Sequence, residues 1–187
     1  MLTGKRHWKL ILVIILLLGF GGISSLYAES TLSGSILSSV IVSDPTPQVG
    51  DEIKVDIIID VTDVDPPDDS LGSFTGHLKW DPSVIAYKSN SGIKDPFSGI
   101  VNSMGDHLIF NGAQAMGAQG SSNVVTITFE AINPGSSDIE LEYSAMAAAF
   151  TFVDMLPILT IEEGTVQIEE PAINSFLPLI LSGNSGS

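Results

Sequence analysis

Histidine is the side chain best suited to acid–base chemistry and metal binding near neutral pH. Two histidines, His77 and His107, lie in the central part of this sequence. Each belongs to the polar side of a segment in which apolar and polar residues alternate, 73–80 and 107–113. We therefore interpret both as outward-facing polar positions on strands, and a metal-binding or acid–base pair is the alternative.

A second group that could bind a ligand is a run of aspartates next to Pro66 and Pro67. Its members are Asp60, Asp63, Asp65, Asp68 and Asp69. Calcium takes several carboxylate oxygens, so a calcium site in the Asp60–Asp69 loop is one interpretation. The spacing differs from an EF-hand loop, because the two prolines stand where a glycine would make the sharp turn. We interpret the segment as a solvated loop and expect no metal site and no cofactor.

Sugar-binding β-sandwiches use exposed aromatic rings, and aromatic residues make up only 7% of this chain. Trp80 shares its predicted face with Phe74 and Leu78, so we expect it in the core. Tyr87 and Tyr143 remain as candidate platforms. A carbohydrate-binding module, with polysaccharide as its ligand, is therefore the alternative function.

Catalysis has little support in the sequence. There is no nucleophile elbow, phosphate loop, zinc-protease helix motif or recognisable pair of catalytic carboxylates. The absence of cysteine excludes thiol catalysis, disulfides and cysteine metal sites. We expect no catalytic residues and no enzyme activity.

Residues 1–28 have the pattern of a secretory signal peptide, with a basic start, an apolar run and a stretch of small residues. The basic residues are Lys5, Arg6 and Lys9. An uncleaved anchor is the alternative, although the apolar run 10–23 is shorter than the ~20 residues of a membrane span. We expect a protein that is secreted, extracellular or at the cell surface, with no membrane span in the mature chain.

The remaining chain is strongly acidic. Three of the 7 basic residues lie in the leader, so 4 basic residues face 22 acidic ones, a formal charge of −18. Phosphate backbones and anionic membranes repel such a surface, so nucleic acid is not an expected partner. The plainest role of this charge is solubility.

The chain divides into a short linker, 29–35, one domain, 36–169, and a tail, 170–187. Period-two alternation, which is typical of half-buried strands, runs through most of the domain. The expected strands are 36–43, 53–61, 73–80, 84–88, 107–113, 123–132, 139–143 and 158–168, the last with a kink at Glu163-Gly164. Segment 144–155 permits a helical turn or a strand, and we interpret it as a strand. An all-β sandwich or jelly roll follows.

The tail contains a run of six apolar residues, Phe176–Leu181, one of which is Pro178. This run is too short to span a bilayer. We interpret it as a strand edge or a disordered tail, with a sticky or sorting peptide as the alternative.

The segment 71–85, LGSFTGHLKWDPSVI, resembles the cohesin domain of bacterial cell-surface scaffolds. Further similar segments bring the resemblance to about 36–168. They are 105–113, 124–131, 133–135 and 163–168. The resemblance implies a nine-stranded jelly-roll β-sandwich that is non-catalytic and binds a dockerin, a small calcium-loaded helical domain of a partner protein.

In that family the dockerin sits on one flat sheet face. Carried onto this chain, the resemblance places the partner-binding residues on two neighbouring strands. They are Ser73, Thr75, His77 and Lys79 on the first strand, and His107, Ile109 and Asn111 on the second. We expect Thr75, His77 and Ile109 to make the central contacts. A structural cell-surface subunit that self-associates is a further alternative.

Overall fold

The computed structural model describes residues 32–170 as one compact unit. The predicted signal peptide, the first three residues of the linker and all of the tail after residue 170 lie outside the described residues. Within 32–170, no helix is long and apolar enough to cross a membrane.

Almost every element in this part of the chain is a strand. The described strands are β1 (Gly34–Val42), β2 (Glu52–Val64), β3 (Leu71–Lys79), β4 (Ile85–Asn90), β5 (Ser98–Ser103), β6 (His107–Ala118), β7 (Ser121–Ala131), β8 (Gly135–Ala148), β9 (Leu159–Glu162) and β10 (Gly164–Ile168). A short 3₁₀ turn, η1 (Leu156–Ile158), precedes β9. The all-β class is confirmed.

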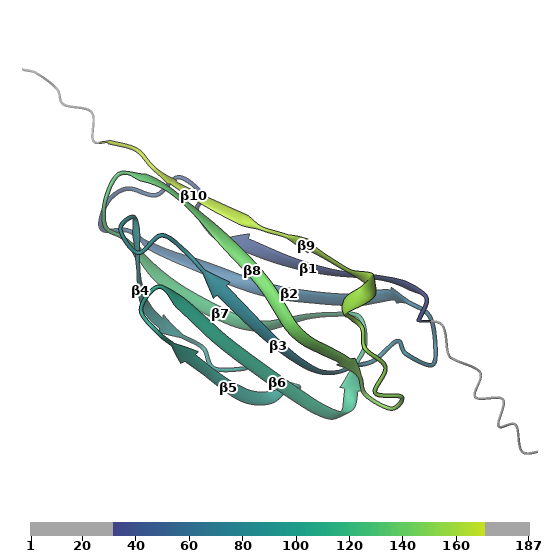
Figure 1. Cartoon of the computed structure of the whole chain (residues 1–187). Coiled ribbons are helices and arrows are strands. Elements are labelled where there is room, and N and C mark those ends of the chain that lie inside the picture. Colours follow the sequence, from purple (N-terminus) through teal and green to yellow (C-terminus); the bar gives the residue numbers. More distant parts are fainter. Residues whose placement is uncertain (1–31, 171–187) are drawn as a thin grey trace, which may run out of the picture. The chain divides into compact units, whose positions relative to one another are not determined.

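The strands form two five-stranded layers, which Figure 1 shows one behind the other. Sheet A has the order β4-β7-β2-β1-β9, and sheet B has the order β10-β8-β3-β6-β5. Neighbouring strands are antiparallel except β1 and β9, which pair in parallel. The predicted jelly-roll sandwich is therefore confirmed.

The alternating pattern places one face of each sheet in the core. Along β2, the five alternating residues from Ile53 to Val61 are at most 2% exposed, as the sequence pattern predicts. Trp80 is 6% exposed and its ring meets Phe129 edge-on, with ring centroids 4.9 Å apart. The prediction that Trp80 belongs to the core is confirmed.

Glycines allow two phenylalanines to lie flat against neighbouring strands of sheet B. Phe74 on β3 stands opposite Gly112 on β6, and Gly76 stands opposite Phe110. A Cβ atom at Gly112 would lie 2.5 Å from Cζ of Phe74, and one at Gly76 would lie 2.3 Å from Cζ of Phe110. Each ring therefore occupies the space that a side chain on the other strand would fill.

The predicted kink at Glu163-Gly164 is the point where the chain changes sheets. β9 pairs with β1 in sheet A, whereas β10 pairs with β8 in sheet B. A Cβ at Gly164 would approach Cγ1 of Val40 to 2.9 Å, so the crossing runs close against β1. The last expected strand is thus two strands.

Two further details correct the sequence analysis. The described residues form ten strands instead of nine. β5 was missed and segment 158–168 divides into two strands, whereas 139–143 and the start of 144–155 belong to one strand, β8. β5 is an edge strand with Val101 as its one half-buried residue, so it has no period-two pattern. The strand interpretation of 144–155 is wrong beyond Ala148, where residues 149–152 form a turn.

Candidate partner-binding face

The pairing of β3 with β6 brings all seven predicted site residues onto the outer face of sheet B. The opposing pairs are Ser73 with Ala113, Thr75 with Asn111, His77 with Ile109, and Lys79 with His107. Directly opposed residues in an antiparallel pair point to the same side of the sheet. The sheet B outer face thus carries a continuous two-strand patch, although its role in binding stays a prediction.

These side chains are held in place by their neighbours. Six of the seven are half-buried, and Lys79 is exposed. Because half-buried groups on a sheet have restricted rotamers, they lose little side-chain entropy when a partner covers them.

One end of the face is charged. Lys79 Nζ lies 3.1 Å from Oε2 of Glu142, which β8 supplies from the other side of β3. At the start of β6, Nδ1 of His107 lies 2.7 Å from Oδ1 of the preceding residue, Asp106. That contact holds the pKa of the Asp106 carboxyl below its ordinary value, mainly through the hydrogen bond from His107.

An open hollow of about 710 Å³ occupies this charged end. It is lined by His77, Lys79, Trp80, Asp81, Asp106, His107, Ser136, Asp138, Glu140 and Glu142. None of its five acidic residues was among the predicted site residues. Three of them come from β8, which only strand pairing brings next to β3, and the other two lie in loops. The signal in the sequence was the alternation of Asp138, Glu140 and Glu142 with buried residues in β8.

β5 extends the face beyond β6. Ile100 stands opposite Asn111, and Asn102 stands opposite Ile109. Ile100 is 56% exposed, which is high for isoleucine. These two positions were also missed, because β5 itself was not recognised.

The histidines are not part of a described metal centre. No group of three or more histidine, aspartate or glutamate residues within 32–170 is arranged to hold a metal ion. In the acidic loop, Asp60 accepts hydrogen bonds from Thr62, and Asp69 accepts one from Gln119 at 2.7 Å. Asp60 and Asp69 are therefore turned to separate protein partners.

The tyrosines that were candidate sugar platforms face inward. The Tyr143 hydroxyl lies 2.8 Å from Oγ of Ser38, which is fully buried, and burial raises the pKa of this tyrosine. The Tyr87 ring stacks on Trp80 with centroids 6.4 Å apart. Both tyrosines are half-buried and pack against the core, so neither presents the exposed ring face that a sugar platform needs.

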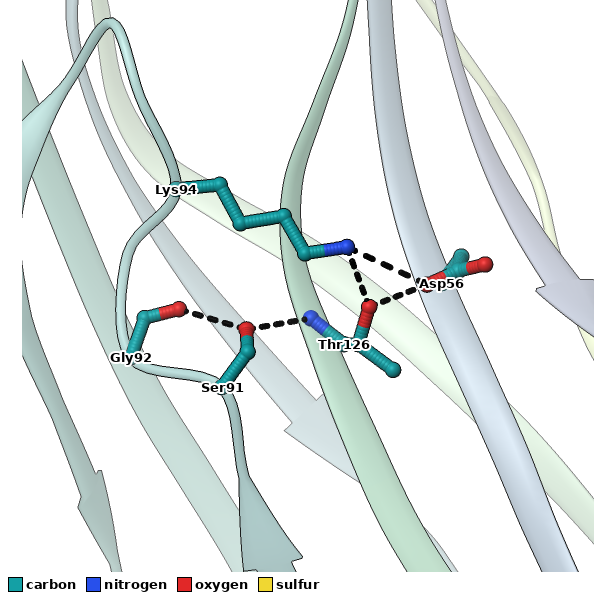
Figure 2. Close-up of polar contacts among 5 residues, drawn as sticks. All are labelled: Asp56, Ser91, Gly92, Lys94 and Thr126. Atoms are coloured by element: carbon teal, nitrogen blue, oxygen red, sulfur yellow. Dashed lines mark hydrogen bonds and ion pairs between the residues drawn. The ribbon is translucent and has the colours of Figure 1, made fainter.

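A second polar cluster lies on the outer face of sheet A (Figure 2). Lys94, in the connection from β4 to β5, donates to Oγ1 of Thr126 on β7, and Thr126 donates to Asp56 on β2. Lys94 Nζ is also 3.6 Å from Oδ1 of Asp56. The Thr126 backbone N–H donates to Oγ of Ser91 at 3.0 Å.

This cluster joins two strands and a loop, and we assign it a structural role. Burial alone would raise the pKa of Asp56, but hydrogen bonds from Thr126 and Asn123 and the charge of Lys94 bring it below its ordinary value. A carboxylate with a lowered pKa is a weak base, so it would activate the Thr126 hydroxyl poorly. The cluster fastens the connection that carries the chain from sheet A to sheet B.

Comparison with known proteins shows similarity in fold. The sequence matches no protein-family model and no curated protein. Solved cohesin structures do match. A non-cellulosomal cohesin from the hyperthermophilic archaeon Archaeoglobus fulgidus aligns with a TM-score of 0.59 and 14% identity, over 73% of this chain and 92% of that chain.

Two bacterial cohesins give similar values. A type I cohesin from Clostridium thermocellum, solved in complex with a dockerin, aligns with a TM-score of 0.58 and 16% identity, over 75% of this chain and 97% of that chain. A type I cohesin from Pseudobacteroides cellulosolvens aligns with a TM-score of 0.55 and 17% identity, over 74% and 94% of the two chains. The described domain therefore has the cohesin fold, as the sequence resemblance implied.

Proposed function

We propose that this domain is a non-catalytic docking module that binds a protein partner of the dockerin kind on the sheet B outer face. The observation that carries the proposal is that the seven predicted residues, spread over 73–111, lie on one face of two paired strands. The matching fold of cohesins solved with dockerins supports the nature of the partner. Export of the chain, with secretion or surface display, belongs to the same proposal.

The physical basis is a rigid surface. β3 is paired on both sides, by β6 and β8, so its outward side chains are fixed before a partner arrives. Association then orders few groups, and a small number of central contacts supplies most of the affinity. Thr75, at the middle of β3, is our first choice for such a contact.

The test is direct binding to a panel of purified type I and type II dockerins, measured by calorimetry. We expect saturable binding of at least one dockerin and loss of that binding in Thr75→Arg, because a large cation would stand at the centre of the face. The matched control is Thr128→Arg, a half-buried threonine on β7 of sheet A.

Two results would overturn the proposal. The first is that no dockerin binds. The second is that Thr75→Arg and Thr128→Arg have equal effects on binding while both variants keep the wild-type melting temperature.

A further inference from the structure

The turn that follows β8 holds the one residue other than glycine with positive φ within 32–170, Phe152 at φ 57°. The backbone N–H of Ala148 donates to the carbonyl of Val153 at 3.1 Å and closes the turn over 149–152. In Figure 1 this turn is the yellow-green loop beyond the end of β8. Glycine or asparagine is the usual residue in this left-handed conformation.

Phenylalanine is unfavourable here for two reasons. The left-handed conformation costs a residue with a Cβ about 1–2 kcal/mol. In addition, the Phe152 side chain is 80% exposed, and Phe150, two residues earlier, is 59% exposed. Most of the surface of each phenylalanine stays exposed, so burial in the core does not account for either residue.

The turn is nevertheless fixed. Between the two rings, Thr151 donates a hydrogen bond to Asp68, whose side chain is 2% exposed. Ala149 is buried and its backbone N–H donates to the carbonyl of Ser70 at 2.9 Å. The chain therefore presents two exposed aromatic rings on a rigid support, and local backbone strain of this kind is characteristic of functional sites.

Phe152 borders a hollow of about 320 Å³ that adjoins Ser73, at one end of the sheet B outer face. Its other lining residues are small or uncharged: Gly72, Ser73, Ala113, Gln114, Ala115, Ala148 and Ala149. Met116, next along β6, is 71% exposed. A hollow with this lining suits a large apolar side chain.

The opposite end of the same face is the charged hollow, in which acidic groups outnumber cations. Asp138 and Glu140 have no lysine beside them in the described ion pairs, whereas Lys79 is paired with Glu142. The two ends are separated by the run from Ser73 to Lys79, about 20 Å at ~3.3 Å per residue. The face is thus apolar at one end and acidic at the other.

We propose that this polarity fixes the orientation of the partner, which inserts an apolar side chain beside Phe152 and places lysine or arginine side chains over the acidic end. The inference rests on the proposed function and names the chemistry of the partner surface. Charge complementarity favours a basic partner over a second copy of this acidic domain, because two such surfaces repel each other.

The probe is a synthetic helical peptide of about 14 residues, which spans about 20 Å at ~1.5 Å per residue. Leucines lie near one end and lysines near the other, and the matched peptide has glutamates instead of the lysines. Titrations are followed by amide NMR of the domain. We expect saturable shifts at Phe152 and Glu142 with the lysine peptide, weaker binding as salt rises, and none with the glutamate peptide.

Two variants separate binding from folding. In Phe152→Gly and Phe152→Asn, both of which tolerate positive φ, we expect the melting temperature not to fall, while affinity for the lysine peptide decreases at least tenfold. Ile41→Ser is the control, because Ile41 is an exposed apolar residue on β1 of sheet A.

Equal binding of both peptides, unchanged affinity in the Phe152 variants, or dimerisation of the wild-type domain that Phe152→Gly abolishes would each overturn the inference. In each of those cases, the proposed function would still stand if a dockerin bound the wild-type domain and Thr75→Arg abolished that binding. If no dockerin bound but the peptides behaved as expected, the proposed function would be rejected and the peptide result would still stand.

Discussion

Thr126 makes the central contact of the polar cluster on sheet A, since its hydroxyl accepts from Lys94 and donates to Asp56. Both partners are charged, and hydrogen bonds to charged groups contribute more to stability than those between neutral groups. The side chains of Lys94 and Asp56 are 34% and 37% exposed, so water reduces that contribution.

We expect Thr126→Val to lower the free energy of unfolding by about 1–2 kcal/mol, because it removes both hydrogen bonds at nearly constant volume. Urea unfolding measures the change. Thr128→Val, two residues along β7 on the same face, should change the value by less than about 0.5 kcal/mol. Equal effects of the two substitutions would show that the cluster adds nothing beyond local packing.

That the seven candidate residues share one face of the sheet could be predicted from the sequence, because each strand carries its own signal. Alternation in 73–80 and 107–113 assigned each side chain to a face before any strand was paired. Phe152 could not be found this way, since its importance comes from a backbone angle and from exposure. Nor could the Lys94, Thr126 and Asp56 contacts, which join residues up to 70 positions apart.

At the scale of single elements, β3 and β6 depend on each other through their glycines. Each strand supplies a phenylalanine that covers the glycine opposite on its neighbour, and the Phe74 and Phe110 ring centroids lie 6.1 Å apart. At these two positions the inner face of the pair is therefore filled by a ring that lies over a glycine. This packing also helps to fix the register of the two strands that carry the predicted site.

Gly112→Ala should lower the free energy of unfolding by about 1–3 kcal/mol, because the new methyl group overlaps the Phe74 ring. Chemical denaturation gives the value. The neighbouring variant Ala113→Gly, at an exposed outward position, should cost less than about 1 kcal/mol. A larger loss in Ala113→Gly than in Gly112→Ala would contradict the close approach of ring and backbone.

The alternating patterns predicted some strands well and missed others, and the difference follows from how each strand is packed. β2 is central in sheet A and its inward residues are all buried, so its pattern was plain. β5 is an edge strand rich in serine and glycine, and β8 ends in a turn whose phenylalanines resemble a strand in composition. Edges and turns are set by what packs against them, which the local sequence does not record.

At the scale of the whole molecule, five described carboxyl groups have a pKa below the ordinary value. They are Glu52, Asp56, Asp60, Asp81 and Asp106. A group whose pKa is lower in the folded state stabilises the fold above its unfolded pKa, and that stabilisation is lost as the pH falls through the folded value.

We therefore expect the urea midpoint to be steady between pH 7 and pH 5 and to fall below about pH 4.5, the unfolded value for glutamate. The measurement is made in about 0.5 M NaCl, where screening removes most of the long-range repulsion among the acidic residues. A midpoint that stays level or rises between pH 5 and pH 3 would show that these carboxyl contacts do not hold in solution.

The first and last strands of sheet A suggest how the domain responds to tension. β1 and β9 run side by side in the same direction, with Ile36 opposite Leu159 and Ser39 opposite Glu162. A pull on the chain before β1 and after β10 therefore acts along both strands in opposite senses. The hydrogen bonds between them are loaded together instead of one after another, so forced unfolding has to break them as a set.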